Sequence, residues 1–191
     1  MTYLGAKAAN LVRLRDDFKV YVPEFTALLW SDLFENFARV SPKINALHAT
    51  YLAGDISDVQ FEKQAAKYIA SLTLNAKTIE AAHSTIADAG WKKVSFRTSA
   101  LNEDGAEHSF AGQYESYVDR AYTKAAMKKY ALECFKSMLS LRVISYAKAR
   151  GFIELPIGGS LIIQEMFYGA QSGVLFTEDG GGNSTVAYVA S

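Results

Sequence analysis

Residues 161–167 read Leu-Ile-Ile-Gln-Glu-Met-Phe, a short apolar run that predicts a β-strand. Residues 173–177 and 185–189 predict two further strands, and glycine-containing turns separate the three. An antiparallel meander is the simplest pairing for strands in this order. The segments before them predict mainly helices, so helices precede a cluster of strands. This order favours an α+β fold with helices and a mostly antiparallel sheet over regular β-α-β winding.

Helical periodicity dominates the first half of the chain. Apolar side chains recur at helical spacing from Gly5 to Phe18, over 61–72 and over 79–86. Val22-Pro23 breaks the first of these helices, because proline disfavours helical backbone at the residue before it. Gly90 is a natural C-terminal stop for the third.

Other helix boundaries follow from single residues. Ser31 is a candidate N-cap for a short aromatic helix, and Ser41-Pro42 is predicted to start a separate region. The longest helix is predicted over 123–150, because its apolar residues alternate four and three apart and Gly151 ends the pattern. Short strands are predicted at 94–96 and 114–118, on either side of a polar stretch.

The amino-acid composition limits the classes of function that the chain can have. The 191 residues carry 20 Lys+Arg and 20 Asp+Glu, and half of them are apolar, which fits one sizeable core and excludes a disordered chain. Zero net charge argues against bulk electrostatic capture of nucleic acid or of an anionic membrane, but permits a nucleotide bound by local positive charge. The sequence shows neither a membrane-spanning run nor a secretory signal at its start. The single cysteine, Cys134, fits a cytoplasmic protein.

Two cations are candidates for an anion site. Gly5-Ala6-Lys7 opens a helix, where free N–H groups and a lysine attract phosphate; an ordinary solvated lysine is the alternative. Arg97 ends a predicted strand and offers a planar fork of donors suited to phosphate oxygens. A salt bridge from Arg97 to Glu103 or Asp104 is at least as well supported by spacing alone.

Two segments could contribute backbone groups. Gly112, with Gln113 beside it, could be a turn where the chain approaches a ligand, or a simple bend before the next strand. The groups near Gln164 to Phe167 could bind an adenine edge if that strand faces a cleft, whereas a buried core strand is the commoner case. The three histidines and Cys134 form no metal-ligand spacing, so no zinc site is predicted.

The joint order of these segments resembles the N-terminal nucleotide-binding domain of the phosphoenolpyruvate synthase and pyruvate phosphate dikinase family, an ATP-grasp-like fold. Residues 5–11, G-A-K-A-A-N-L, resemble the family's G-G-K-x-A-[NS]-L. Residues 96–104, F-R-T-S-A-L-N-E-D, resemble V-R-S-S-A-x-x-E-D, and residues 109–116, S-F-A-G-Q-Y-E-S, resemble S-F-A-G-Q-x-E-T. Weaker blocks lie at 22–25, 134–138, 142–146, 163–167 and 172–177.

The resemblance implies roles for the candidate residues. Lys7 and Arg97 would contact ATP phosphates, Arg97 taking part in catalysis, and the loop with Gly112 and Gln113 would close over them. Gln164 and Met166 would lie at the adenine hinge. In an intact enzyme of this kind ATP would phosphorylate a histidine carrier and then pyruvate, with Mg²⁺ held by ligands outside this chain.

The resemblance also implies that residues 1–191 are the N-terminal part of a longer, truncated nucleotide-binding domain. The chain stops after a strand, at Ser191, and its histidines lie outside the family's T-x-G-G-x-x-x-H context. The partners would then be ATP and the missing phosphohistidine and pyruvate domains, and the chain alone would be inactive.

Other readings stay open. Rifampicin phosphotransferases and glucan or water dikinases share this domain, and their acceptors would bind elsewhere. A non-catalytic nucleotide-binding or interaction module is a third reading. It draws on departures from the family pattern at Ala6 and 179–182, whereas Glu24, where the usual V-P-x-G-F loses its glycine, is a further departure.

Overall fold

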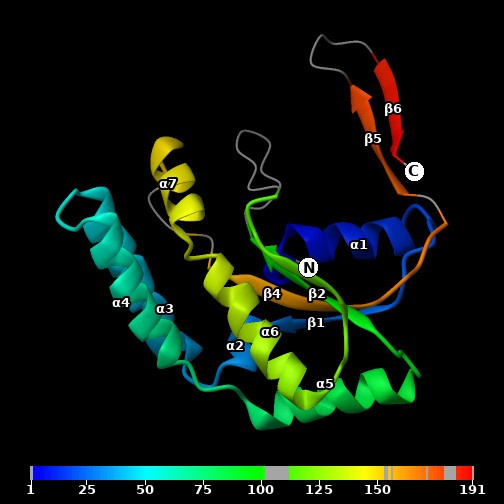
Figure 1. Cartoon of the computed structure of the whole chain (residues 1–191), viewed down its shortest axis with the longest axis horizontal. Helices are drawn as coiled ribbons and strands as arrows, with labels where there is room; N and C mark the ends of the chain where they lie inside the picture. The colour runs from blue at the N-terminus through cyan, green and yellow to red at the C-terminus, as the bar shows by residue number, and fades with distance from the viewer. Residues whose placement is uncertain are drawn as a thin grey trace.

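A computed structural model shows helices packed around a four-stranded sheet, with a separate hairpin at the C-terminal end (Figure 1). It describes residues 2–101, 112–152, 155, 157–170, 172–178 and 184–190, the last two ranges as backbone. The helices are a short 3₁₀ turn Thr2–Leu4, α1 Ala6–Asp16, α2 Trp30–Leu33, α3 Phe37–Leu52, α4 Asp58–Ala70, α5 Ala76–Asp88, α6 Lys124–Ser137 and α7 Leu141–Ala149. The strands are β1 Phe25–Leu29, β2 Val94–Ala100, β3 Ser116–Arg120, β4 Gly159–Glu165, β5 Ser172–Glu178 and β6 Ser184–Ala190.

The main sheet has the order β1-β4-β2-β3, with every neighbouring pair antiparallel. The predicted α+β fold with a mostly antiparallel sheet is therefore confirmed. The predicted meander is confirmed for β5 and β6, which pair antiparallel, but it is wrong for β4, which lies between β1 and β2 in the other sheet. The run Leu161–Ile163 explains the central position, since all three side chains are fully buried and a central strand has both faces covered.

Successive side chains of β2 point to opposite faces of the sheet. Phe96 lies opposite Ile163 and stacks on Tyr130 of α6, with ring centroids 5.1 Å apart. Arg97 lies opposite Ile162 and belongs to the other face, toward α1. The strand therefore separates a helix-covered apolar layer from a more polar one.

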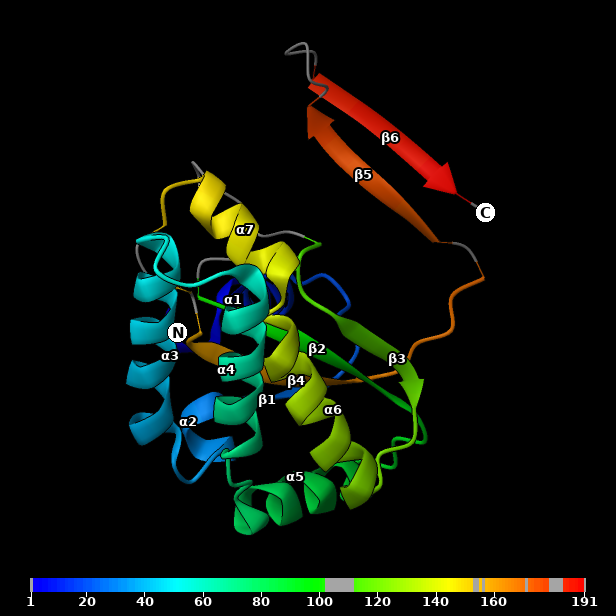
Figure 2. The same cartoon turned by 60° about the vertical axis from the view of Figure 1, so that its left-hand side comes forward.

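The main core lies between the sheet and the helices that cover one side of it. Figure 2 shows α6 running across this face with α5 below it, while α3 and α4 form an antiparallel pair beside them. Phe135 of α6 packs edge-on against Trp30 and Phe34 near α2, at centroid distances of 5.3 Å each. No helix in the described part of the chain is long and apolar enough to cross a membrane.

Two predicted helix boundaries near residue 40 are wrong. Pro42 lies inside α3, although proline removes an N–H and disfavours a helix interior. Helix α3 continues because its buried residues keep one stripe on both sides of the proline: Val40, Ile44, Leu47, His48 and Tyr51. Ser31 lies inside α2, whose N-cap is Leu29, and so caps nothing.

The predicted single helix over 123–150 is two helices, α6 and α7, divided at 138–140. The apolar periodicity is real, since Met127, Cys134 and Met138 are all buried. Serine hydroxyls end one helix and begin the next, because Ser137 Oγ donates to Cys134 O at 2.7 Å and Ser140 Oγ accepts from Val143 N at 3.4 Å. The periodicity of apolar residues does not record such a change of direction.

Candidate functional site

The start of α1 is fastened to the sheet at very short range. Gly5 has φ 83°, and a Cβ built on it would lie 2.2 Å from Ser99 O, so only glycine fits there. Ser99 Oγ accepts from Ala8 N at 3.0 Å, and Ser160 Oγ donates to Leu4 O at 2.6 Å. The N-terminus of α1 is thereby held over the ends of β2 and β4.

Lys7 is half-buried in the second position of α1. Its Nζ donates to the main-chain carbonyl of Thr98 at 3.0 Å, so the ammonium group lies at β2, beside the residue that follows Arg97. The side chain is therefore not an ordinary solvated lysine. Its charge stands at the start of α1, where the N-cap Gly5 has no side chain to cap the helix and Ser99 Oγ accepts from Ala8 N; the positive charge and the positive end of the helix dipole both favour an anion.

Arg97 and Gln164 form one hydrogen-bonded unit across β2 and β4. Arg97 Nη1 donates to Gln164 Oε1 at 3.1 Å, and Gln164 Nε2 donates to Pro23 O at 3.1 Å. Gln164 is only 6% exposed, whereas Arg97 is half-buried. The amide has both ends engaged, so it fixes the orientation of the Arg97 guanidinium. The alternative partners Glu103 and Asp104 lie outside the described residues.

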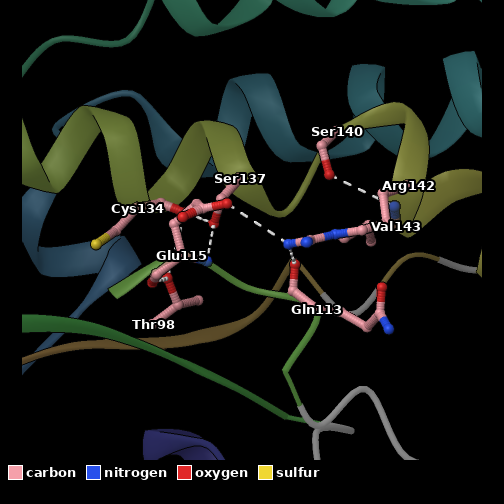
Figure 3. A network of polar contacts seen from close by, with 8 residues as sticks. All are labelled: Thr98, Gln113, Glu115, Cys134, Ser137, Ser140, Arg142 and Val143. Carbon is pink, nitrogen blue, oxygen red and sulfur yellow. Dashed lines mark hydrogen bonds and ion pairs between the residues drawn. The ribbon is translucent and has the colours of Figure 1, made fainter. Parts of the chain in front are cut away.

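Gly112 and Gln113 lead into β3 at an exposed turn, and Gly112 has φ 71°. Arg142 Nη2 donates to Gln113 O and lies 3.5 Å from Glu115 Oε1 (Figure 3). Glu115 N donates to Ser137 Oγ at 3.2 Å. The segment after the glycine is therefore anchored on the α6–α7 junction; Ser109, Phe110 and Ala111 lie outside the described residues.

Thr98 connects this segment to the strand. Its Oγ1 lies 3.4 Å from Glu115 O and 3.3 Å from Cys134 O, on the core side of β2, while its own carbonyl receives Lys7. Burial raises the pKa of the Cys134 thiol to about 12, so Cys134 is an inert core residue, as its position on the apolar seam predicts.

The predicted adenine hinge begins where β4 ends. Met166 is half-buried, and its N donates to Lys93 O at 2.9 Å, while Glu165 N donates to Glu24 O at 2.8 Å. Glu24 Oε2 also accepts from the Trp91 indole at 3.1 Å. Glu24, at the place where the family's V-P-x-G-F pattern loses its glycine, thus has a structural partner of its own.

The structure joins some predicted residues and leaves others apart. Arg97 is hydrogen-bonded directly to Gln164, and Lys7 donates to the carbonyl of Thr98, the residue after Arg97. Among the described residues, Gln113 is connected to β2 indirectly, through Arg142 and Glu115. Sequence reasoning missed the supporting residues Ser99, Ser137 and Arg142. The signal for them in the sequence was that they lie within segments that resemble the family's motifs, at 96–104, 134–138 and 142–146.

Metal ligands do not gather in this part of the protein. Among the described residues no three His, Cys, Asp or Glu side chains form a group that could hold an ion. We therefore assign no magnesium ligand to these residues.

The whole chain also matches a known family of domains. Residues 1–191 match the model of the pyruvate phosphate dikinase AMP/ATP-binding domain. The chain belongs to this family. The predicted membership in the phosphoenolpyruvate synthase and pyruvate phosphate dikinase family is confirmed.

Curated relatives fall in two named groups. A probable phosphoenolpyruvate synthase of Methanocaldococcus jannaschii is 26% identical over 91% of this chain and 15% of its own length. The phosphoenolpyruvate synthase of Synechocystis sp. is 36% identical over 45% of the chain and 11% of the relative. A rifampicin phosphotransferase of Streptomyces sviceus is 34% identical over 49% of the chain and 11% of the relative. The chain thus spans a small part of each relative that it matches.

Proposed function

We propose that this domain is the ATP-binding part of a dikinase-type phosphotransferase in which Lys7 and Arg97 contact the phosphates. The observation that supports this most is the Arg97–Gln164 unit beside the anchored start of α1. Arg97 lies on β2, Lys7 of α1 donates to the carbonyl of the next residue of the same strand, and family membership supplies the nucleotide class. We place this reaction in the cytoplasm.

The residues have distinct parts in this proposal. Lys7 and Arg97 offset the negative charge of the phosphates, Arg97 also during transfer, and fixed cations of this kind stabilise phosphoryl transfer. Gly112 and Gln113 cover the phosphates from the β3 side. Gln164 and Met166 border the adenine pocket at the end of β4.

The reaction we propose for the intact enzyme takes phosphate from ATP to a histidine carrier, and then to pyruvate, with water or inorganic phosphate as a second acceptor. Magnesium would be bound by ligands outside the described residues. His48 is fully buried and His83 lies against Tyr122, with ring centroids 5.5 Å apart, so neither is placed as a mobile carrier; His108 lies outside the described residues. In this proposal the carrier and the pyruvate site belong to other domains of the intact enzyme.

The rifampicin phosphotransferase relative supports a second acceptor, an antibiotic in place of pyruvate. Both proposals use the same ATP site and differ only in domains that this chain does not contribute. A binding module without any acceptor is the third outcome, in which ATP binds but no enzyme uses it.

Calorimetric titration of the 191-residue chain with ATP tests the site. Lys7→Met and Arg97→Gln should each raise the Kd about tenfold or more, because each removes a charge-assisted hydrogen bond. Exposed Lys63→Met and Arg39→Gln are matched controls that should leave the Kd unchanged. Unchanged affinity in both site variants would overturn the assignment.

A radiolabel experiment tests the need for a separate carrier. With γ- or β-labelled ATP, the chain alone should incorporate no phosphate, because no described histidine is placed to accept it. Stable labelling of the isolated chain would contradict this part of the proposal.

A further inference from the structure

We propose that Arg142 is a positioning residue, which holds the Gly112–Gln113 turn in the conformation that binds ATP phosphates. This inference rests on the proposed function, because it concerns the same site. Arg142 lies in the first turn of α7, beyond the break in the predicted long helix. A continuous helix would carry this side chain in another direction, so the break is what aims Arg142 at the turn.

The guanidinium contacts the turn at two levels. Its Nη2 donates to the backbone carbonyl of Gln113 and lies 3.5 Å from the Glu115 carboxylate. In Figure 3 the Gln113 carbonyl faces Arg142, while the side-chain amide of Gln113 points away from it. Arg142 therefore binds the backbone of this residue and not its side chain.

The Gln113 side chain has an unsatisfied oxygen. Its Oε1 is buried and has no hydrogen-bond partner among the described residues, which is a costly arrangement for a polar atom. A ligand or ordered water that donates a hydrogen bond would satisfy it. Arg142 fixes the backbone that carries this amide.

The remaining contacts keep the end of the turn in place. Glu115 N donates to Ser137 Oγ at 3.2 Å, and Ser137 Oγ donates onward to Cys134 O at 2.7 Å. Thr98 Oγ1 lies 3.4 Å from Glu115 O, and Thr98 O receives Lys7. Thr98 of β2 thus contacts both the segment after the turn and Lys7, the lysine that we propose to bind phosphate.

The Arg142–Glu115 ion pair alone does not explain this arrangement. Both side chains are slightly more than half exposed, and ion pairs of this kind contribute little to stability. The hydrogen bond to a main-chain carbonyl instead fixes a direction of the backbone. Loss of Arg142 should therefore affect the turn and its ligand much more than global unfolding.

Hydrogen exchange and titration together test the role. In Arg142→Gln, amides of residues 112–117 should exchange faster in the ligand-free chain, and the Kd for ATP should rise about tenfold, the loss of one hydrogen bond to a charged group. The Kd for adenosine, which lacks phosphates, should stay the same. Arg142→Lys, which keeps one charged donor, should recover part of the affinity.

Arg150→Gln is the matched control, because Arg150 is an exposed arginine at the other end of α7 and lies over the Tyr146 ring. It should change neither exchange at 112–117 nor ATP affinity. Exchange that stays as slow in Arg142→Gln as in the wild type overturns the positioning role. So does full ATP affinity in Arg142→Gln when Lys7→Met and Arg97→Gln have lost theirs.

The outcomes separate this inference from the proposed function. If the wild-type chain binds no ATP, the proposed function and the phosphate-binding role of the turn both fail. If ATP binds and Lys7→Met weakens it while Arg142→Gln does not, only the inference fails. Faster exchange together with weaker binding of ATP, but not of adenosine, supports both.

Discussion

The two faces of the four-stranded sheet differ in what their side chains do, although they alternate along the same strands. On the core face of β2, Val94, Phe96 and Ala100 are fully buried against the helices. On the other face, Ser99 is equally buried but serves as a hydrogen-bond acceptor for α1, and Arg97 donates to Gln164. Burial alone therefore does not distinguish the apolar face from the face on which we propose the binding site.

The difference shows how this protein combines a stable scaffold with a charged site. The core face contributes apolar burial, which is large and non-directional. The α1 face relies on directed contacts: a glycine that permits close approach, and hydroxyls that hold a helix start. Substitutions on the first face should mainly change the free energy of unfolding. On the second face, loss of Arg97 should mainly change ligand affinity, whereas loss of a contact that holds α1 should also lower stability.

The largest effect should come from Phe96→Ala on the core face. Removing this fully buried ring should lower the free energy of unfolding by about 3–5 kcal/mol, through lost transfer energy and a cavity. Urea denaturation measures it. The adjacent Arg97→Gln, on the other face, should change stability by about 1 kcal/mol or less; equal destabilisation by both variants would refute the division between faces.

Gly5→Ala should have the next largest effect. A methyl group there meets Ser99 O at 2.2 Å and requires positive φ, so we expect a loss of about 3 kcal/mol and weaker ATP binding as α1 moves off the sheet. Gly54 has the same φ of 83° with nothing within 4 Å of the added Cβ, which makes Gly54→Ala the matched control. Its cost should be about 1 kcal/mol, for backbone strain alone. Equal costs would show that the close approach of α1 is unimportant.

Ser99→Ala should have a smaller effect. It removes the hydroxyl that accepts from Ala8 N, and losing such a helix-start contact costs about 1 kcal/mol. Thermal unfolding measures the change, with exposed Ser84→Ala in α5 as the control. A neutral Ser99→Ala would mean that water replaces the contact.

Ionisation of the Cys134 thiol, in the core beside the sheet, should not change the free energy of unfolding at neutral pH but should lower it in alkali. Burial raises its pKa from 9.0 to about 12, so the folded thiol stays protonated while the unfolded thiol ionises above pH 9. The unfolded state then binds fewer protons, and stability falls as pH rises from 9 toward 12. Relative to Cys134→Ala, wild type should lose about 1 kcal/mol between pH 8 and pH 10 in urea denaturation. A constant difference would show that the thiol is accessible to solvent when folded.

Local sequence signals predicted most elements but not their neighbours. Apolar periodicity located α4, α5 and the two halves of the long helix, because one face of each packs on the core. It could not show the turn at 138–140, since serine hydroxyls redirect the backbone without changing the apolar spacing. It also gave a meander where β4 inserts between β1 and β2, because strand order depends on contacts across the whole chain.

The sequence by itself determined the class of fold and the family, and it singled out the two cations that we propose for the site, Lys7 and Arg97, because these depend on residue type and on motif order. Only the tertiary structure decided what orients them: Gln164 for Arg97, Thr98 for Lys7 and, in our proposal, Arg142 for the Gln113 turn. These partners are separated from their targets by 67, 91 and 29 positions in the chain. Their role depends on strand pairing and on the direction in which a helix restarts, and local spacing encodes neither of these.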